Sequence, residues 1–159
     1  MKQILILGMA LLIILGGYSL GEKRYVKDHS EELEKIPVSN ELYTVRVIKA
    51  TNQIIKTAQN IKANSIQVGL GSRDYKEDIE IVEKHLEEIQ AARDEIMSFL
   101  PDEDKEIDRE SLVEAIDDYA VSVKEHLDLI NQDEIDIDTY KNSIDVITTK
   151  IGVIKLYIN

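Results

Sequence analysis

The sequence predicts an all-α protein, an antiparallel up-down-up-down four-helix bundle that follows an N-terminal hydrophobic signal or anchor helix. Four stretches of about 20 to 29 residues repeat apolar side chains at spacings of three and four, which is the period of an amphipathic helix. Short polar turns separate these stretches, and no stretch alternates apolar and polar residues for long enough to predict a strand. A long antiparallel coiled coil and a three-helix core are the alternatives.

The composition limits the classes of protein that the chain can belong to. The 159 residues include no cysteine, so disulfides, thiolate nucleophiles and cysteine metal sites are excluded. The net charge of −12 would repel nucleic acid phosphates, so we expect no nucleic acid partner. Isoleucine, leucine and valine supply most of the apolar side chains, and Glu, Asp and Lys supply the surface, as is typical of helical bundles.

Residues 1–21 are predicted to be a signal peptide or a transmembrane anchor. Lys2 precedes an apolar run, and residues 4–20 contain no charged side chain. That length is at the short limit for a helix that crosses a membrane, and small residues near its end would also suit a cleavage site. Tyr18 stands where a lipoprotein signal would need cysteine, so lipid attachment is excluded. Cleavage and retention both remain open.

The charges that flank the apolar segment bear on its orientation. Lys23, Arg24 and Lys27 follow it, and the positive-inside rule would keep such a flank in the cytoplasm. A short basic start before an apolar core is nevertheless the pattern of export signals. We therefore expect a single-pass protein of the cell membrane with an extracytoplasmic domain, or a secreted protein if the segment is cleaved.

The rest of the chain divides into a polar stalk, residues 22–38, and an acidic helical domain, residues 39–159. Pro37 closes the stalk. Glycines and Ser72 are expected to separate the first two helices, and Pro101 to end the second. The predicted helices cover residues 40–68, residues 73–100, a third stretch from Asp108 or Ser111 to Ile130, and a fourth for which Asp138 is the predicted N-cap. Residues 102–110 are predicted to be an acidic turn.

The first and last helices carry more apolar side chains than a single stripe requires. In the first helix two apolar stripes lie about 120° apart at 100° per residue. One interpretation is that the bundle buries a wide arc of both helices; the other is that one stripe is a docking face for a protein partner or for a second copy of the chain. On the second interpretation, the candidate partner-binding residues are Tyr43, Val47, Ile54, Ile61, Val146, Val153 and Tyr157.

The patterns that would indicate catalysis or metal binding are missing from the sequence. The acidic turn after Pro101 alternates like a calcium-binding loop, but it has Ile107 where that loop needs glycine and Val113 where it needs glutamate. His85 and His126 lack the Glu-x-x-His spacing of di-iron bundles, and we expect both on the surface, at the edges of their stripes. We therefore predict no catalytic residue, no metal and no cofactor.

These observations favour a non-catalytic helical interaction module at the cell envelope, exported or tethered to the membrane through residues 4–20. A sensor or carrier that binds a small ligand between its helices is the alternative. An enzyme is the third and least favoured interpretation, because its active site would have to be assembled from residues scattered along the chain.

Overall fold

The computed structural model describes residues 36–158, and within them the all-α prediction is confirmed. The predicted anchor, residues 1–21, lies outside the described residues. The long helices are α2 (Asn40–Gly69), α3 (Ile79–Ser98), α4 (Glu103–Ile130) and α5 (Ile137–Lys155). The shorter elements are β1 (Ile36–Pro37), the 3₁₀ helix η1 (Tyr75–Asp78) and β2 (Phe99–Leu100). None of the described helices is both long and apolar enough to cross a membrane.

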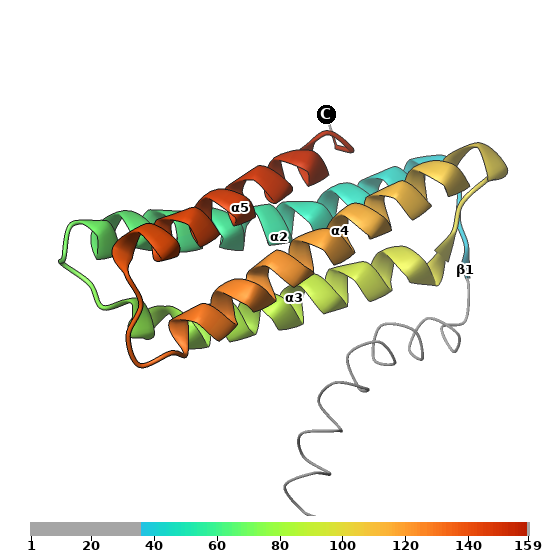
Figure 1. Ribbon diagram of the computed structural model, residues 1–159. Coiled ribbons are helices and arrows are strands. Elements are labelled where there is room, and N and C mark those ends of the chain that lie inside the picture. Colours follow the sequence, from blue (N-terminus) through green and yellow to red (C-terminus); the bar gives the residue numbers. More distant parts are fainter. Residues whose placement is uncertain (1–35, 159) are drawn as a thin grey trace, which may run out of the picture. The chain divides into compact units, whose positions relative to one another are not determined.

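The four long helices lie side by side around one core (Figure 1). Each packs against the helix that precedes or follows it in the chain, and α2 also packs against α5. The residues that face the centre follow the predicted spacing: Ile144, Ile147, Ile151 and Ile154 of α5 are all buried. Burial of apolar side chains such as these supplies most of the free energy that holds each helix against the core, since helix propensity alone is too weak.

Polar side chains at the helix starts fix where the helices begin. The Ser39 hydroxyl accepts a hydrogen bond from the Leu42 backbone N–H, which caps α2. The Asp136 carboxylate caps α5 by accepting from the backbone N–H groups of Asp138 and Thr139. The predicted cap, Asp138, is therefore wrong by two residues, because Asp136 is the residue with an extended backbone.

Helix α4 begins at Glu103, so the prediction of an acidic turn over residues 102–110 is wrong. Acidic side chains in a first helical turn are stabilised by the partial positive charge of the helix N-terminus, and this turn contains Glu103, Asp104 and Glu106. The Glu106 carboxylate also lies 3.0 Å from the Arg109 guanidinium one turn later. The run of acids that resembled a solvated turn is thus a favourable helix start.

A two-residue parallel ladder joins β1 to β2, which the sequence did not predict. The Val38 N–H extends it by donating to the Leu100 carbonyl at 3.2 Å. The compact unit accordingly begins at Lys35, so residues 36–38 belong to the helical domain rather than to the stalk predicted over residues 22–38. Every buried apolar side chain of the described core lies between Tyr43 and Ile154, inside this unit.

Candidate functional site

Helix α5 is the shortest of the four long helices. It has 19 residues, whereas α2 has 30 and α4 has 28. At 1.5 Å per residue, α5 falls short of α4 by about 14 Å and of α2 by about 16 Å. Helix α3 has 20 residues, but η1 directly precedes it and extends its N-terminal end.

The missing length lies at the C-terminal end of α5. At the opposite end, Gly69 is packed near Lys141: a Cβ on Gly69 would lie 3.8 Å from the Lys141 side chain. Farther along, the Lys150 ammonium donates to the Asp118 carboxylate at 2.8 Å, and Asp118 stands well inside α4. The first turns of α2 and α4 consequently extend past Lys155, where α5 ends.

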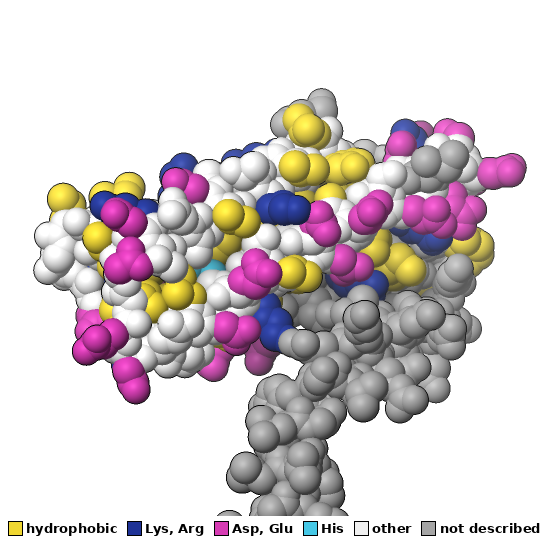
Figure 2. All heavy atoms as spheres, viewed as in Figure 1, with side chains coloured by type: hydrophobic (Ala, Val, Ile, Leu, Met, Phe, Trp, Pro, Cys, Tyr) yellow, Lys and Arg dark blue, Asp and Glu magenta, His cyan; other side chains and the backbone are white. Residues whose placement is uncertain are grey.

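A pocket of about 420 Å³ occupies this place, and we call it the α5-end pocket. Its lining comes from the start of α2, the start of α4 and the three residues after α5. The lining residues are Tyr43, Thr44, Val47, Ile48, Lys105, Asp108, Leu112, Leu156, Tyr157 and Ile158. Figure 2 shows hydrophobic side chains gathered beside the chain terminus, at the end of α5.

The walls of the α5-end pocket combine apolar side chains with Thr44, Lys105 and Asp108, and its rim is exposed. Val47 and Leu112 are buried at its base, whereas Ile48 and Leu156 are exposed, Leu156 by 75%. Large apolar side chains that surround a concavity favour a binding surface over a chance exposure, since scattered single exposures are ordinary. A ligand or partner side chain that enters this pocket would remove both the base and the rim from water.

Tyr43 contributes a phenol side chain, largely buried, to the lining of the α5-end pocket. Burial raises the pKa of Tyr43 to about 12; Arg109 opposes this shift and Asp108 adds to it. The hydroxyl is therefore neutral at physiological pH and can donate a hydrogen bond to a bound group.

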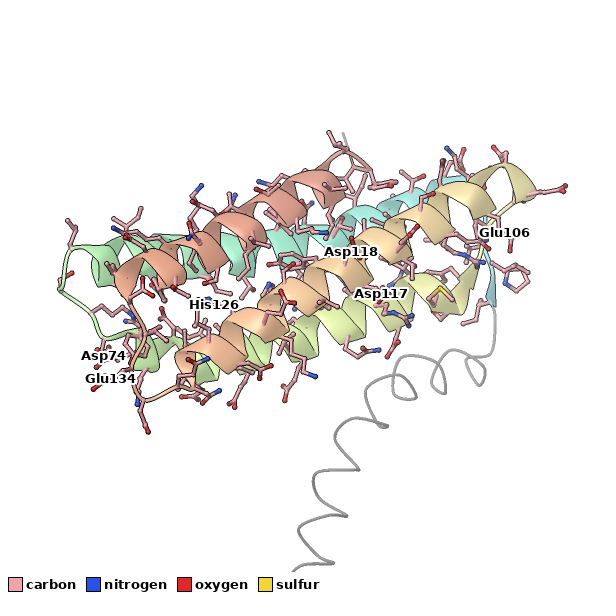
Figure 3. The ribbon with its side chains drawn as sticks, viewed as in Figure 1. Asp74, Glu106, Asp117, Asp118, His126 and Glu134 are labelled. Carbon is pink, nitrogen blue, oxygen red and sulfur yellow. The ribbon has the colours of Figure 1, made fainter. Side chains whose placement is uncertain are left out.

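The charge at this end of the domain is negative. Residues 101–110 contain six acidic and two basic side chains, a net charge of −4. The Lys105 ammonium, which lines the pocket, is held by Asp108 at 3.2 Å. The Asn40 side chain holds Asp104 by a 3.3 Å hydrogen bond. Figure 3 marks Glu106 on the same stretch of α4.

The structure corrects the predicted docking face on the first helix. Tyr43, Val47, Ile54 and Ile61 are buried in the core, so they do not form an exposed stripe. Their stripe faces the centre because α3 and α5 flank α2 on both sides. The exposed residues belong to the other stripe, where Val45 and Ile66 are each 61% exposed.

The predicted residues on the last helix do lie at the surface. Val146, Val153 and Tyr157 are 45%, 42% and 40% exposed. Of the seven candidates, the structure brings Tyr43, Val47 and Tyr157 together at the α5-end pocket; the other four lie outside it. The sequence analysis missed the other seven pocket residues: Thr44, Ile48, Lys105, Asp108, Leu112, Leu156 and Ile158. The difference in helix length could have revealed these residues, but it depends on helix bounds that the apolar pattern does not define.

Both histidines of the described region are buried, so their predicted surface position is wrong. His85 Nε2 lies 2.7 Å from the Tyr119 hydroxyl, and His126 Nδ1 lies 2.8 Å from the Ser143 hydroxyl. Because the Ser143 hydroxyl donates to the Tyr140 carbonyl, we infer that His126 Nδ1 carries the hydrogen of this pair. His126 is marked in Figure 3 between α4 and α5.

Burial keeps the two imidazoles neutral. It lowers the pKa of His126 from 6.5 to about 4. Burial likewise lowers the pKa of His85 to about 4, although Glu88 opposes this shift. Glu88 lies 3.7 Å from His85 Nδ1, which is too long for a hydrogen bond. The histidines therefore act as polar members of the core, each with one ring nitrogen that finds no partner in the described structure.

In the remaining polar clusters, the charged side chains are already paired with other side chains of the same cluster. The buried carboxylate of Asp78 accepts hydrogen bonds from Asn64 at 3.0 Å and from Arg73 at 2.9 Å. Asp117 binds Arg93 of α3, whereas Asp118 binds Lys150 of α5, so these adjacent carboxylates point to different helices (Figure 3). Among residues 36–158, no three His, Asp or Glu side chains are grouped so that they could hold a metal ion.

A second pocket, of about 300 Å³, lies at the opposite end of the domain, near Asp74 in Figure 3. Its only basic group is Arg73, and both Asp78 and Glu77 already form ion pairs with that guanidinium. An anionic ligand would have to compete with these carboxylates. The second pocket is therefore a weaker candidate than the α5-end pocket.

Comparison with known proteins supplies no family: no family model, no curated protein and no solved structure matches the chain. What bears on function is then the chemistry of the chain's own residues. Of the two pockets described above, the α5-end pocket has the larger volume, and its rim exposes Ile48 and Leu156.

Proposed function

We propose that this protein is a non-catalytic interaction module at the cell envelope, either exported or tethered to the membrane through residues 4–20. Its domain is an antiparallel up-down-up-down four-helix bundle that follows the N-terminal anchor. The observation that carries the proposal is the α5-end pocket, where Ile48, Leu156 and Tyr157 expose apolar surface around a cavity of about 420 Å³. Such surface favours a protein contact, since its burial is the main driving force of association.

A small-ligand carrier is the second candidate, and the Tyr43 hydroxyl is the observation that favours it. Ligand pockets are commonly about 300–1,000 Å³, with apolar walls and a few polar groups that orient the ligand. The α5-end pocket falls within this range. The exposed rim favours a protein over a small ligand, because a small ligand would leave Leu156 in water.

The first test concerns the side of the membrane. An alkaline phosphatase fused after residue 159 should be active in a bacterial host, because this enzyme needs an oxidising compartment for its disulfides. The apolar run behind Lys2 motivates this expectation. If instead only a cytoplasmic reporter works at that position, the positive-inside count of Lys23, Arg24 and Lys27 is the better guide, and the proposed location is lost.

The second test concerns the contact surface. A photoreactive benzoylphenylalanine in place of Leu156 should give discrete protein adducts in intact cells that make the protein naturally. The same group in place of Leu70 is the control, since Leu70 is 78% exposed and stands at the end of α2, away from the α5-end pocket. Equal adduct patterns at both positions, or none at either, would remove the support for an interaction module that uses this end.

A further inference from the structure

We propose that the α5-end pocket receives a short cationic amphipathic helix of another protein, which takes the fourth-helix position beyond the end of α5. The inference rests on the proposed function and specifies its partner. Three observations carry it: the vacant length beside α2 and α4, the apolar surface that this vacancy leaves open, and the sign of the charge around it.

The vacancy is long enough for a short helix. Helix α5 falls short by about 14 to 16 Å, and residues 156–158 continue from it through turn hydrogen bonds, so about 9 to 12 Å remains, or about two helical turns. Its walls are the first turns of α2 and α4, with Val47 and Leu112 at the base. Elsewhere in the domain the corresponding space between these two helices is filled by α5. A partner helix with apolar residues at positions i, i+3, i+4 and i+7 would continue the same packing.

The charge around the vacancy selects a cationic partner. Asp104 and Asp108 lie on the first turns of α4, and the net charge of residues 101–110 is −4. The one lysine that lines the pocket, Lys105, is already bound to Asp108. Because Lys105 and Asp108 offset each other, the excess negative charge lies on the other acidic residues of the range 101–110. Lysine or arginine on the flanks of an entering helix would be attracted to that excess, whereas acidic flanks would be repelled.

The same charge argues against a second copy of this chain as the occupant. A twofold interface places the same surface on both sides, so the negatively charged range 101–110 of one copy would approach a surface with the same net charge on the other. Unpaired like charges across an interface are costly. A different protein with a basic helix avoids this repulsion.

The experiment titrates the domain, residues 35–159, whose buried core lies within this unit. The probe is a fluorescein-labelled 14-residue peptide of leucine and lysine, with leucines at i, i+3, i+4 and i+7. The matched probe has glutamate in place of every lysine. Fluorescence anisotropy should show that the lysine peptide binds at least tenfold more tightly than the glutamate peptide.

Two double variants test the location. Ile48→Ser with Leu156→Ser removes the apolar rim and should weaken binding of the lysine peptide at least tenfold. Ile66→Ser with Leu70→Ser is the control: it removes the same two residue types from exposed positions at the other end of α2, and it should change the affinity less than twofold. Circular dichroism of both variants verifies that each remains folded.

The outcomes separate the possibilities. Tenfold loss in the rim variant alone, together with rejection of the glutamate peptide, supports the proposal. Equal binding to both variants indicates adsorption to a generally acidic protein and overturns the site. Equal binding of the two peptides overturns the cationic partner, and no binding of either overturns the helix as occupant. If adducts at position 156 form in cells while the lysine peptide fails, the interaction module stands and only the basic helix is lost.

Discussion

Replacing Val47 and Ile54 together with glutamate should unfold the domain at 25 °C. Ile54 is wholly buried and Val47 nearly so, and both face the core. Each substitution removes an apolar contact and places a carboxylate among buried apolar side chains, at a cost of about 3 to 5 kcal/mol. The sum approaches or exceeds the total stability of an ordinary domain, about 5 to 15 kcal/mol.

The matched control is Val45→Glu with Ile66→Glu. It makes the same two exchanges on the same helix, at side chains that are 61% exposed. Circular dichroism should show a cooperative thermal transition close to that of the parent domain for the control and little remaining helix for the Val47 and Ile54 pair. If the core pair stays folded with an unchanged midpoint, α2 presents a different face to the core and the position of the α5-end pocket is wrong.

The apolar spacing predicted the helices because burial drives their formation. The stripe Ile144, Ile147, Ile151 and Ile154 was visible in the sequence and is the buried face of α5. The same reasoning could not decide which stripe of α2 faces inward. Two apolar stripes are present, and the choice depends on where α3 and α5 pack rather than on α2 itself.

The surface position predicted for the two histidines was wrong because the prediction followed the polarity of the side chain rather than its position along the helix. His85 lies three residues after Val82 and four before Ile89, so it stands on the buried stripe of α3. His126 similarly lies seven residues after Tyr119, which is the same face of α4. Their hydrogen bonds to Tyr119 and Ser143 make the burial tolerable, and these bonds span helices, so they are invisible along the chain.

The α5-end pocket could not be predicted for a different reason. It arises from a difference of about ten residues between helix lengths, and the apolar pattern of the last helix continues to Ile158 although α5 ends at Lys155. The residues after α5 leave the helix but keep their apolar character. The apolar pattern of the sequence therefore continues past Lys155 and does not show where the helix ends.

The stability of the domain should fall as the pH is lowered from 7 to 4.5, and the buried histidines should cause a defined part of the loss. Burial lowers the pKa of His85 and of His126 from 6.5 to about 4. Between these values the unfolded chain binds protons that the folded domain excludes, so protonation favours unfolding. The stabilisation is complete above pH 6.5 and declines through the window down to pH 4, by about 2 kcal/mol per histidine at pH 4.5.

Urea unfolding of the parent domain and of His126→Asn at pH 7.0, 5.5 and 4.5 isolates this contribution, because the carboxylates titrate alike in both proteins and cancel in the difference. At pH 7.0 the variant should be less stable, since asparagine leaves part of the imidazole volume empty beside Tyr140. At pH 4.5 the parent alone has a histidine to protonate at this site, so the gap should shrink by about 2 kcal/mol. His85→Gln should behave in the same way, with a smaller change if Glu88 approaches the imidazolium and stabilises it. A gap that stays constant over all three pH values would mean that these histidines titrate equally in the folded and unfolded states, and so are not held neutral in the core.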